Sequence, residues 1–478
     1  MFDRKSADQN DPALTNDDLS PSVRRTWGWK DYLFLWMSNI HSVAGYVTIG
    51  SFLMIGLPVT HILAAMMVAI IIVQLGCNLM AGPSMVSGAP FPVVARMAFG
   101  VYGAAVPATI RGCIAIGWYG IQTWLASNAL VILVISLHPA FSPLASASLH
   151  GFAGLSLIGW MAFLAVWGLQ ITIFWNGMNA VRRFIDWAGP AIYGMMIVLV
   201  LWLLSRTSWH FPASLPVTKT ASSLGGMLDI VTMVVAYFSP IVLNFGDFAR
   251  YASSTSAVRK GNFLGLPLNF LAFSLLSLSS ISLTLPVFGQ LLTDPVETIA
   301  RLDNTTASVI GIITFVIATA GINITANFVS AAFDFSSLAP QALSWRKGGL
   351  LAATAAIGIT PWNLYARPEL IHLTLDILGA FICPLAGIVI TDYHIIRNKQ
   401  VDIQALYSTR PQDIYWYSRG INPRALIALA GGTAVSIMLI FAPVWPVVAS
   451  LSELTGLGVS VLLYLLLSSH PAFAGRRH

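Results

Sequence analysis

Residues 35–46 of the chain are LWMSNIHSVAGY, and they place four polar side chains within five positions of a long apolar segment. The four are Ser38, Asn39, His41 and Ser42. A bilayer core offers no water to polar groups, so such a cluster must be buried in protein or line a wet cavity. The stretch therefore predicts an interrupted membrane helix whose interruption forms part of a binding site.

The 478-residue chain around this stretch is 56% hydrophobic and only 9% charged. About 25% of residues are charged in an ordinary soluble domain, so we expect an integral membrane protein. The net charge of +6 comes from scattered basic residues, which argues against nucleic-acid binding. Cys77, Cys113 and Cys383 lie in apolar segments without metal-ligand spacing, so we expect no disulfide, metal site or cofactor.

Twelve apolar stretches are long enough to cross the lipid bilayer, which takes about 20 residues per helix. They lack the alternating pattern of membrane β-strands, so we expect an all-α integral membrane protein with 12 transmembrane helices. The stretches are 32–57, 62–81, 103–136, 155–178, 187–205, 226–245, 262–289, 306–333, 348–366, 370–391, 425–442 and 444–468.

The basic residues divide unequally between the loops that these spans define. With the N-terminus inside, the inner segments hold 21 Lys and Arg residues and the outer segments hold four. Because cytoplasmic loops are enriched in positive charge, we expect both termini in the cytoplasm, with tails at 1–31 and 469–478. The first tail lacks the apolar core of a signal peptide. We expect a multi-pass protein of the plasma membrane, here a bacterial inner membrane.

A second interruption is expected near Pro240, which follows Tyr237, Phe238 and Ser239 in the sixth span. Proline removes one helical hydrogen bond and frees a carbonyl one turn earlier. Five spans separate this position from residues 38–42, as two repeats of five helices require. The alternative interpretation is that Pro240 only kinks a packing helix.

Two further spans carry polar side chains one helical turn apart. Trp118 and Gln122 share one face of the third span, and Asn323 and Asn327 share one face of the eighth. An indole beside a carboxamide suits a flat ring with hydrogen-bonding edges. The alternative is that these side chains pack in the core and hydrogen-bond neighbouring helices.

His41 is the one strong titratable candidate near the middle of a span, because the carboxylates of the spans fall near their ends. Histidine changes charge near neutral pH, and ionisable groups inside membranes are functional by default. A proton-relay role and a neutral hydrogen-bonding role both fit His41.

In the order and spacing of its motifs, the chain resembles the nucleobase–cation symporter-1 family, whose members move nucleobases, hydantoins, allantoin and related heterocycles. The resemblance covers essentially the whole chain and is strongest to the allantoin, uracil and hydantoin permease branch. It rests on Leu19-Ser20-Pro21 with Arg25-Thr26-Trp27, Trp36-Met37 with Ile40-His41, Pro90-Phe91-Pro92-Val93 with Arg96, Trp118 to Trp124, Asp247 to Arg250, Asn323 to Asn327, Pro361-Trp362 and Thr391-Asp392-Tyr393.

The resemblance implies a leucine-transporter-type fold that functions as a monomer. Its first inverted repeat would comprise helices 1–5 (32–205) and its second helices 6–10 (226–391), with helices 11 and 12 at 425–468. The substrate slot would lie between helices 1, 3, 6 and 8.

The resemblance also implies roles for six residues in that slot. Trp118 and Phe238 would sandwich the substrate ring, and Gln122 and Asn327 would hydrogen-bond its amide edge. The backbone at Tyr237 and the side chain of Ser42 would line the same slot.

Sodium-coupled relatives bind the ion at backbone carbonyls that correspond to Ser38, His41 and Ala318. Two hydroxyl side chains complete the site in those relatives, and Gly321 and Ile322 stand at their positions here. Losing two side-chain oxygens leaves few ligands for sodium.

We therefore expect proton coupling, although water or Thr319 could supply missing sodium ligands. His41 and Asp334 are the candidates for carrying the proton. Asn323, on the same span as Asp334, is a further candidate for the coupling machinery.

These observations predict a secondary active symporter that imports a small heterocyclic amide such as uracil, allantoin or a hydantoin. The alternative is a sodium-coupled or uncoupled permease for cytosine, a purine or a vitamin-like ring. The sequence shows no catalytic constellation for an enzyme, no ring of charges for a channel and no GxxxxGK[ST] motif for ATP-driven transport.

Overall fold

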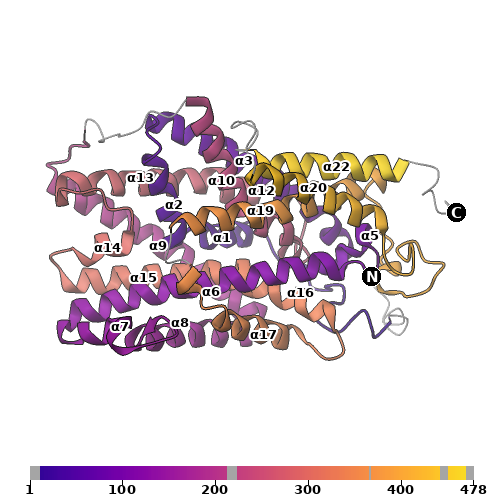
Figure 1. The fold of residues 1–478 in the computed structure, drawn as a ribbon, viewed down its shortest axis with the longest axis horizontal. Helices are drawn as coiled ribbons and strands as arrows, with labels where there is room; N and C mark the ends of the chain where they lie inside the picture. Colours follow the sequence, from indigo (N-terminus) through magenta and orange to yellow (C-terminus); the bar gives the residue numbers. More distant parts are fainter. Residues whose placement is uncertain (1–10, 213–222, 365–367, 442–450, 470–478) are drawn as a thin grey trace.

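The computed structural model of the chain describes residues 11–212, 223–364, 368–441 and 451–469, which form a helical bundle. Ten helical stretches among these residues are long and apolar enough to cross a membrane. In Figure 1, α6, α8, α15, α16 and α17 gather on one side of the bundle, and α3, α10, α19, α20 and α22 on the other. The predicted all-α membrane architecture is confirmed.

The part of the chain before residue 213 contains a run of helices and one short ribbon, in which β1 pairs antiparallel with β2. Its elements are α1 (Trp29–Ile40), α2 (Val43–Leu53), α3 (Val59–Ser87), α4 (Phe91–Val94), α5 (Arg96–Phe99), α6 (Ala105–Leu137), η2 (Pro139–Ala145), α7 (Ala147–His150), β1 (Gly151–Phe152), β2 (Leu155–Ser156), α8 (Leu157–Trp175) and α9 (Met178–Arg206).

The part after residue 222 is helical throughout its described elements, with three π-helical segments at η3, η4 and η5. Its elements are α10 (Ser223–Asn244), α11 (Gly246–Ala249), α12 (Thr255–Phe263), η3 (Leu264–Leu268), α13 (Asn269–Phe288), α14 (Pro295–Ala300), α15 (Thr305–Ile322), η4 (Asn323–Val329), α16 (Ser330–Leu338), α17 (Trp345–Gly358), α18 (Pro361–Leu364), α19 (Pro368–Thr391), η5 (Asp392–Ile396), η6 (Ala405–Tyr407), α20 (Pro423–Phe441) and α22 (Ser452–Ser469).

The first predicted span is interrupted where the polar cluster lies. Helix α1 ends at Ile40 and α2 begins at Val43, so His41 and Ser42 form an extended link between them. The hydroxyl of Ser42 accepts a hydrogen bond from the backbone N–H of Gly45 at 2.9 Å. The N–H of Val43 donates to Oγ1 of Thr319 on α15 at 3.2 Å. Side chains thus satisfy backbone groups that the interruption frees.

The predicted interruption at Pro240 was wrong, because α10 continues through this proline to Asn244. Proline leaves the carbonyl of Ala236 without its helical donor. The hydroxyl of Ser239 donates to that carbonyl at 2.8 Å, so the helix keeps its course at Pro240. The chain bends after Asn244, where Phe245 separates α10 from α11.

The number of spans and the inverted repeat stay predictions. The first predicted span consists of the two shorter helices α1 and α2, and the ninth contains α17, which has 14 residues. Residues 444–450 of the twelfth predicted span lie outside the described residues, as do residues 1–10 of the predicted N-terminal tail and 470–478 of the predicted C-terminal tail.

Residues 11–28, which we predicted to be part of a cytoplasmic tail, pack against the ends of several helices. The side chain of Asn16 donates to Oγ of Ser336 at 2.9 Å and to the carbonyls of Pro340 and Leu343 at 3.1 Å each. The carboxylate of Asp18 accepts from the backbone N–H of Trp345 at the start of α17, at 2.8 Å.

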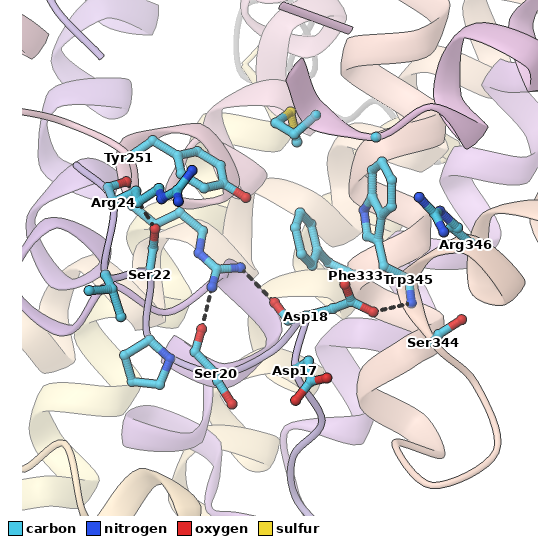
Figure 2. Close-up of a pocket in the computed structure, with 15 residues that line it drawn as sticks. Asp17, Asp18, Ser20, Ser22, Arg24, Tyr251, Phe333, Ser344, Trp345 and Arg346 are labelled. Carbon is cyan, nitrogen blue, oxygen red and sulfur yellow. Dashed lines mark hydrogen bonds between the residues drawn. The ribbon is translucent and has the colours of Figure 1, made fainter. Parts of the chain in front are cut away.

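Arg250 holds this N-terminal segment against the helices. Its buried guanidinium donates to the carbonyls of Gly88 and Asp18, at 2.9 Å each, and to the carbonyl of Ser20. Figure 2 shows the pocket beside this cluster, which has a volume of about 670 Å³ and is bordered by the N-terminal segment, Tyr251, Phe333 and the start of α17.

We predict that Arg250→Ala destabilises the protein, because three carbonyls lose a charged donor in a buried position. The expected loss is on the order of 3 kcal/mol, measured as a lower melting temperature of the purified protein in detergent. Arg259→Ala, at an exposed position of α12, is the matched control. Equal melting temperatures for the two variants would contradict this role of Arg250.

Candidate substrate-binding site

Four of the residues predicted to bind substrate line one cavity inside the bundle. They are Trp118 and Gln122 from α6, Tyr237 from α10, and Asn327 from η4. The cavity has a volume of about 20 Å³, which is room for roughly one water molecule. The structure is therefore closed at this point, and a ring can enter only if side chains or helices move.

The aromatic wall of the cavity is formed by Trp118 and Tyr237. Their ring centroids lie 6.0 Å apart and the rings are nearly perpendicular, at 76°. Phe238 lines a neighbouring apolar cavity instead, where its ring stands edge-on to Tyr237 at 5.2 Å and to Phe270 at 5.8 Å. The structure thus places Tyr237 against Trp118, and the stacking role of Phe238 stays a prediction.

Ser42 contacts Tyr237, which lines the same cavity. The hydroxyl groups of Ser42 and Tyr237 lie 3.0 Å apart, and the Tyr237 hydroxyl also contacts the side chain of Gln122. Oε1 of Gln122 is buried and has no hydrogen-bond partner. Burying a polar group without a partner is unfavourable, so this oxygen is a natural position for a substrate donor.

Asn323 and Asn327 belong to a network of amides behind the cavity. Nδ2 of Asn327 donates to Oδ1 of Asn323 at 3.0 Å. The two protons of Asn323 Nδ2 are shared among three acceptors, which are Oε1 of Gln170 on α8 at 2.8 Å and the Tyr119 carbonyl and Oγ1 of Thr123 on α6 at 3.0 Å each. Sequence reasoning missed Gln170, although a glutamine inside an apolar span was a usable signal.

The two asparagines lie in η4, a seven-residue π-helical segment between α15 and α16. Such segments occur frequently at functional sites. Oγ1 of Thr325 lies 2.9 Å from the Gly321 carbonyl oxygen and 2.8 Å from Oδ1 of Asn39 on α1, so these two acceptors share its one proton. This hydrogen bond to Asn39 therefore holds the π-helical segment η4 against the interrupted first span.

Arg111 is a buried residue of α6 to which the sequence analysis assigned no role in the site. Its guanidinium donates to the carbonyl of Pro240 on α10 at 3.3 Å and to that of Ala326 on η4 at 2.6 Å. Pro240 and Ala326 both line the cavity. The signal was available, since residue 111 lies inside a predicted span and arginine inside a membrane is commonly functional.

Asp334 is fully buried on α16, close to Arg111. Its Oδ2 accepts a long hydrogen bond of 3.4 Å from Asn244, and its Oδ1 has no partner. Asn244 also donates to Asp247 at 3.0 Å. The predicted coupling residue Asp334 therefore belongs to a buried cluster of two carboxyl groups, one amide and one guanidinium.

His41 lies in a different environment. Its Nδ1 donates to the carbonyl of Met37, and its Nε2 is buried without a partner. The ring stands edge-on to Tyr193 and Phe273, with centroids 4.2 Å and 4.6 Å away. This arrangement favours the neutral hydrogen-bonding role, because aromatic rings surround the free nitrogen and no carboxylate accompanies it in the described contacts.

The positions predicted for sodium ligands lie close together between α1 and α15. Ser38 and Ala318 are buried, and a Cβ added at Gly321 would lie 2.5 Å from Oγ of Ser38. Oγ of Ser38 has no hydrogen-bond partner. Thr319, the possible substitute ligand, instead accepts from the backbone of Val43.

Comparison with known proteins identifies the family. A family model described as permease for cytosine/purines, uracil, thiamine, allantoin matches residues 20–458. The chain belongs to this permease family. The permease is 31% identical to the allantoin permease of Bacillus subtilis, over 98% of this chain and 96% of that protein. It is 30% identical to the purine-uracil permease NCS1 of Arabidopsis thaliana, over 89% of this chain and 71% of that protein.

A solved structure supports the same fold. The permease resembles Mhp1, a nucleobase-cation-symport-1 family transporter solved in a closed conformation with bromovinylhydantoin bound. The TM-score is 0.76 at 21% identity, and the match covers 96% of this chain and 98% of that one. Family membership confirms that the chain is a multi-pass membrane transporter rather than a membrane-embedded enzyme.

We predict that Arg111→Lys lowers transport at least tenfold while the amount of permease in the membrane stays near normal. Lysine keeps the positive charge but lacks the planar guanidinium group, whose separate nitrogens donate to the two carbonyls. Uptake assays normalised to membrane abundance measure this effect. Arg183→Lys, at an exposed position of α9, is the control. Full activity of Arg111→Lys would show that charge alone suffices at this position.

Proposed function

We propose that the permease imports a small heterocyclic amide, such as allantoin, uracil or a hydantoin, by proton symport. The observation that carries this proposal is the meeting of Trp118, Gln122 and Asn327 in one buried cavity. An indole face offers stacking to a flat ring, and two carboxamides offer hydrogen bonds to its N–H and C=O edge.

The relatives support this substrate class. Two of them are named as permeases for allantoin and for purines and uracil, and the solved structure that resembles this chain holds a hydantoin. All of these ligands are flat heterocycles with amide-like edges, which matches the lining of the cavity.

The closed cavity is consistent with alternating access. Substrate would bind when the slot is open to one side, and closure around the ring would precede opening to the other side. A ligand shifts such an equilibrium only if it binds the states unequally. The tight contact between Trp118 and Tyr237 means that the substrate must separate α6 from α10 or turn one of these rings.

Asp334 is the preferred residue for proton coupling. One of its carboxyl oxygens has no partner and can carry a proton, and Arg111 and Asp247 provide charges that respond to the change. Arg111 also donates to two carbonyls at the cavity. A proton on Asp334 is therefore linked to the substrate slot through one side chain, whereas His41 has no comparable connection.

Sodium coupling is the second candidate, on the strength of one observation. The unpartnered hydroxyl of Ser38 lies 2.5 Å from the position that a Cβ at Gly321 would take, so it could replace one missing oxygen ligand. At the position of the second hydroxyl ligand, Ile322 has an alkyl side chain and offers no oxygen. The sodium site would therefore have fewer oxygen ligands than in sodium-coupled relatives, and this favours proton coupling.

We place the permease in the plasma membrane, as a bacterial inner-membrane protein, with both termini in the cytoplasm because of the excess of basic residues on the inner loops. We propose that it works as a monomer, because the cavity is complete within one chain.

We predict saturable uptake of at least one of radiolabelled uracil, allantoin and hydantoin by cells that express the permease. Trp118→Ala and Asn327→Ala should each abolish this uptake, because stacking and edge recognition are lost, without lowering membrane abundance. Trp187→Ala, at an exposed position of α9, should leave uptake unchanged. Normal uptake by both site variants would disprove the site.

We predict that Asp334→Asn uncouples transport from the proton gradient. Accumulation by the normal permease should collapse with a protonophore and be unaffected when sodium is replaced. The variant should still exchange labelled for unlabelled ring, yet fail to accumulate it. Asp303→Asn, at an exposed position, should accumulate normally. Sodium-dependent accumulation by the unmodified permease would instead favour the Ser38 site.

A further inference from the structure

A carboxyl group away from the substrate cavity lies buried at the start of α22. Glu453 is the second residue of this helix, and its side chain is fully buried. Neither Oε1 nor Oε2 has a hydrogen-bond partner in the part of the chain that the structure describes. An ionised carboxylate without a partner is strongly unfavourable in such a place, and a buried acid avoids this cost by binding a proton.

Glu453 faces α19, the helix that packs alongside α22. Its Oε1 lies 2.4 Å from the position that a Cβ at Gly379 would take, so the missing side chain of this glycine makes room for the carboxyl group. Asp376 stands three residues before Gly379 on the same face of α19, and its charge acts on Glu453. Two carboxyl groups therefore lie on the two sides of the contact between α19 and α22.

The other titratable groups on the helices around Glu453 offer no basic partner among the described residues. The thiol of Cys383 on α19 is close enough for Glu453 to act on it. The helices α20 and α10 also pack against α22, and each carries one charged residue. Arg424 lies about 18 Å along α20 from Ser436, whose hydroxyl contacts the start of α22. Asp229 on α10 is a further acid.

Helix α19 connects this carboxyl group to a wall of the substrate cavity. Figure 1 shows α10, α19 and α22 on the same side of the bundle, and α19 packs against both of the others. The thiol of Cys383 is hydrogen-bonded to the side chain of Ser239 on α10. The next residue, Pro240, lines the cavity. A shift of α19 away from α22 would therefore reach the cavity through α10.

We propose that Glu453 is a second proton-binding site of the permease, that Asp376 strengthens its hold on the proton, and that the bound proton keeps α19 packed against α22. Loss of this proton leaves a buried charge beside a like charge, and both effects drive the two helices apart. The site is separate from Asp334, which belongs to α16 on the other side of the bundle. It goes beyond the proposed function and does not depend on which ring the permease carries.

The first experiment measures the melting temperature of the purified full-length permease in detergent from about pH 6 to about pH 9, a range in which buried glutamates lose their proton. The native state holds the proton and the unfolded state releases it, so the stability of the unmodified permease should fall as the pH rises. Glu453→Gln has no proton to lose, and its melting temperature should fall by at least about 3 °C less. Glu297→Gln, whose native side chain is 47% exposed, is the matched control and should follow the unmodified permease.

A second variant tests the contribution of Asp376. Asp376→Asn removes the like charge, so Glu453 should lose its proton more easily, and the fall in melting temperature should begin about one pH unit lower. This variant keeps Glu453 and therefore tests the site even if Glu453→Gln does not fold. A pH dependence that neither variant changes overturns the proposal. A change in Glu453→Gln alone overturns the role of Asp376.

Infrared difference spectra between the two ends of this pH range observe the proton directly. In the unmodified permease, a C=O band of a protonated carboxyl group should disappear at alkaline pH. This change should be absent from Glu453→Gln and present in Asp334→Asn. Identical difference spectra for Glu453→Gln and the unmodified permease overturn the site.

A transport measurement tests the connection from Glu453 to the cavity. The assay is exchange of labelled for unlabelled uracil, allantoin or hydantoin, with equal pH on both sides of the membrane. Exchange by the unmodified permease and by Asp334→Asn should fall about tenfold at the alkaline end, whereas Glu453→Gln should keep most of its exchange. An equal fall in all three overturns the connection to the cavity. If none of them exchanges any ring, the proposed function is overturned, and the melting and infrared measurements still decide the proton site.

Discussion

The structure depends on one constraint, that every polar backbone group freed inside the apolar bundle must find a partner in the protein. The link at His41 and Ser42 meets this constraint through helix α15 and segment η4. Val43 donates to Thr319, and Asn39 accepts from Thr325. Because these partners are more than 270 residues away along the chain, the interruption is stable only in the assembled bundle, and it ties α1 and α2 to the helix that carries the asparagines.

The same constraint shapes the substrate cavity. Arg111 satisfies carbonyls of α10 and η4 with one guanidinium, so it bridges two walls of the cavity from the third wall, α6. Any movement that separates these helices must replace those hydrogen bonds. Asp334 and Asp247 lie beside this guanidinium, which gives a change of protonation a direct physical route to the position of the helices. In the function that we propose, Arg111 therefore connects proton coupling at Asp334 with substrate binding in the cavity.

Recognition itself follows from the direction of hydrogen bonds rather than from the types of residue alone. A carboxamide can donate or accept, so Gln122 and Asn327 by themselves are compatible with many rings. The carbonyl of Tyr119 can only accept, and this single fact sets the orientation of Asn323 and then of Asn327.

The sequence by itself determined the class of protein, most of the long helices, the interruption at residues 38–42 and the pairs on α6 and η4. These features depend on local composition and on the helical period, which are visible in any short stretch. Only the tertiary structure decided that α10 continues through Pro240, that Tyr237 rather than Phe238 faces Trp118, and that Arg111 and Gln170 reach the site. The rotation of each helix and the partners of its polar groups come from contacts between segments far apart in the chain, and no local pattern records them.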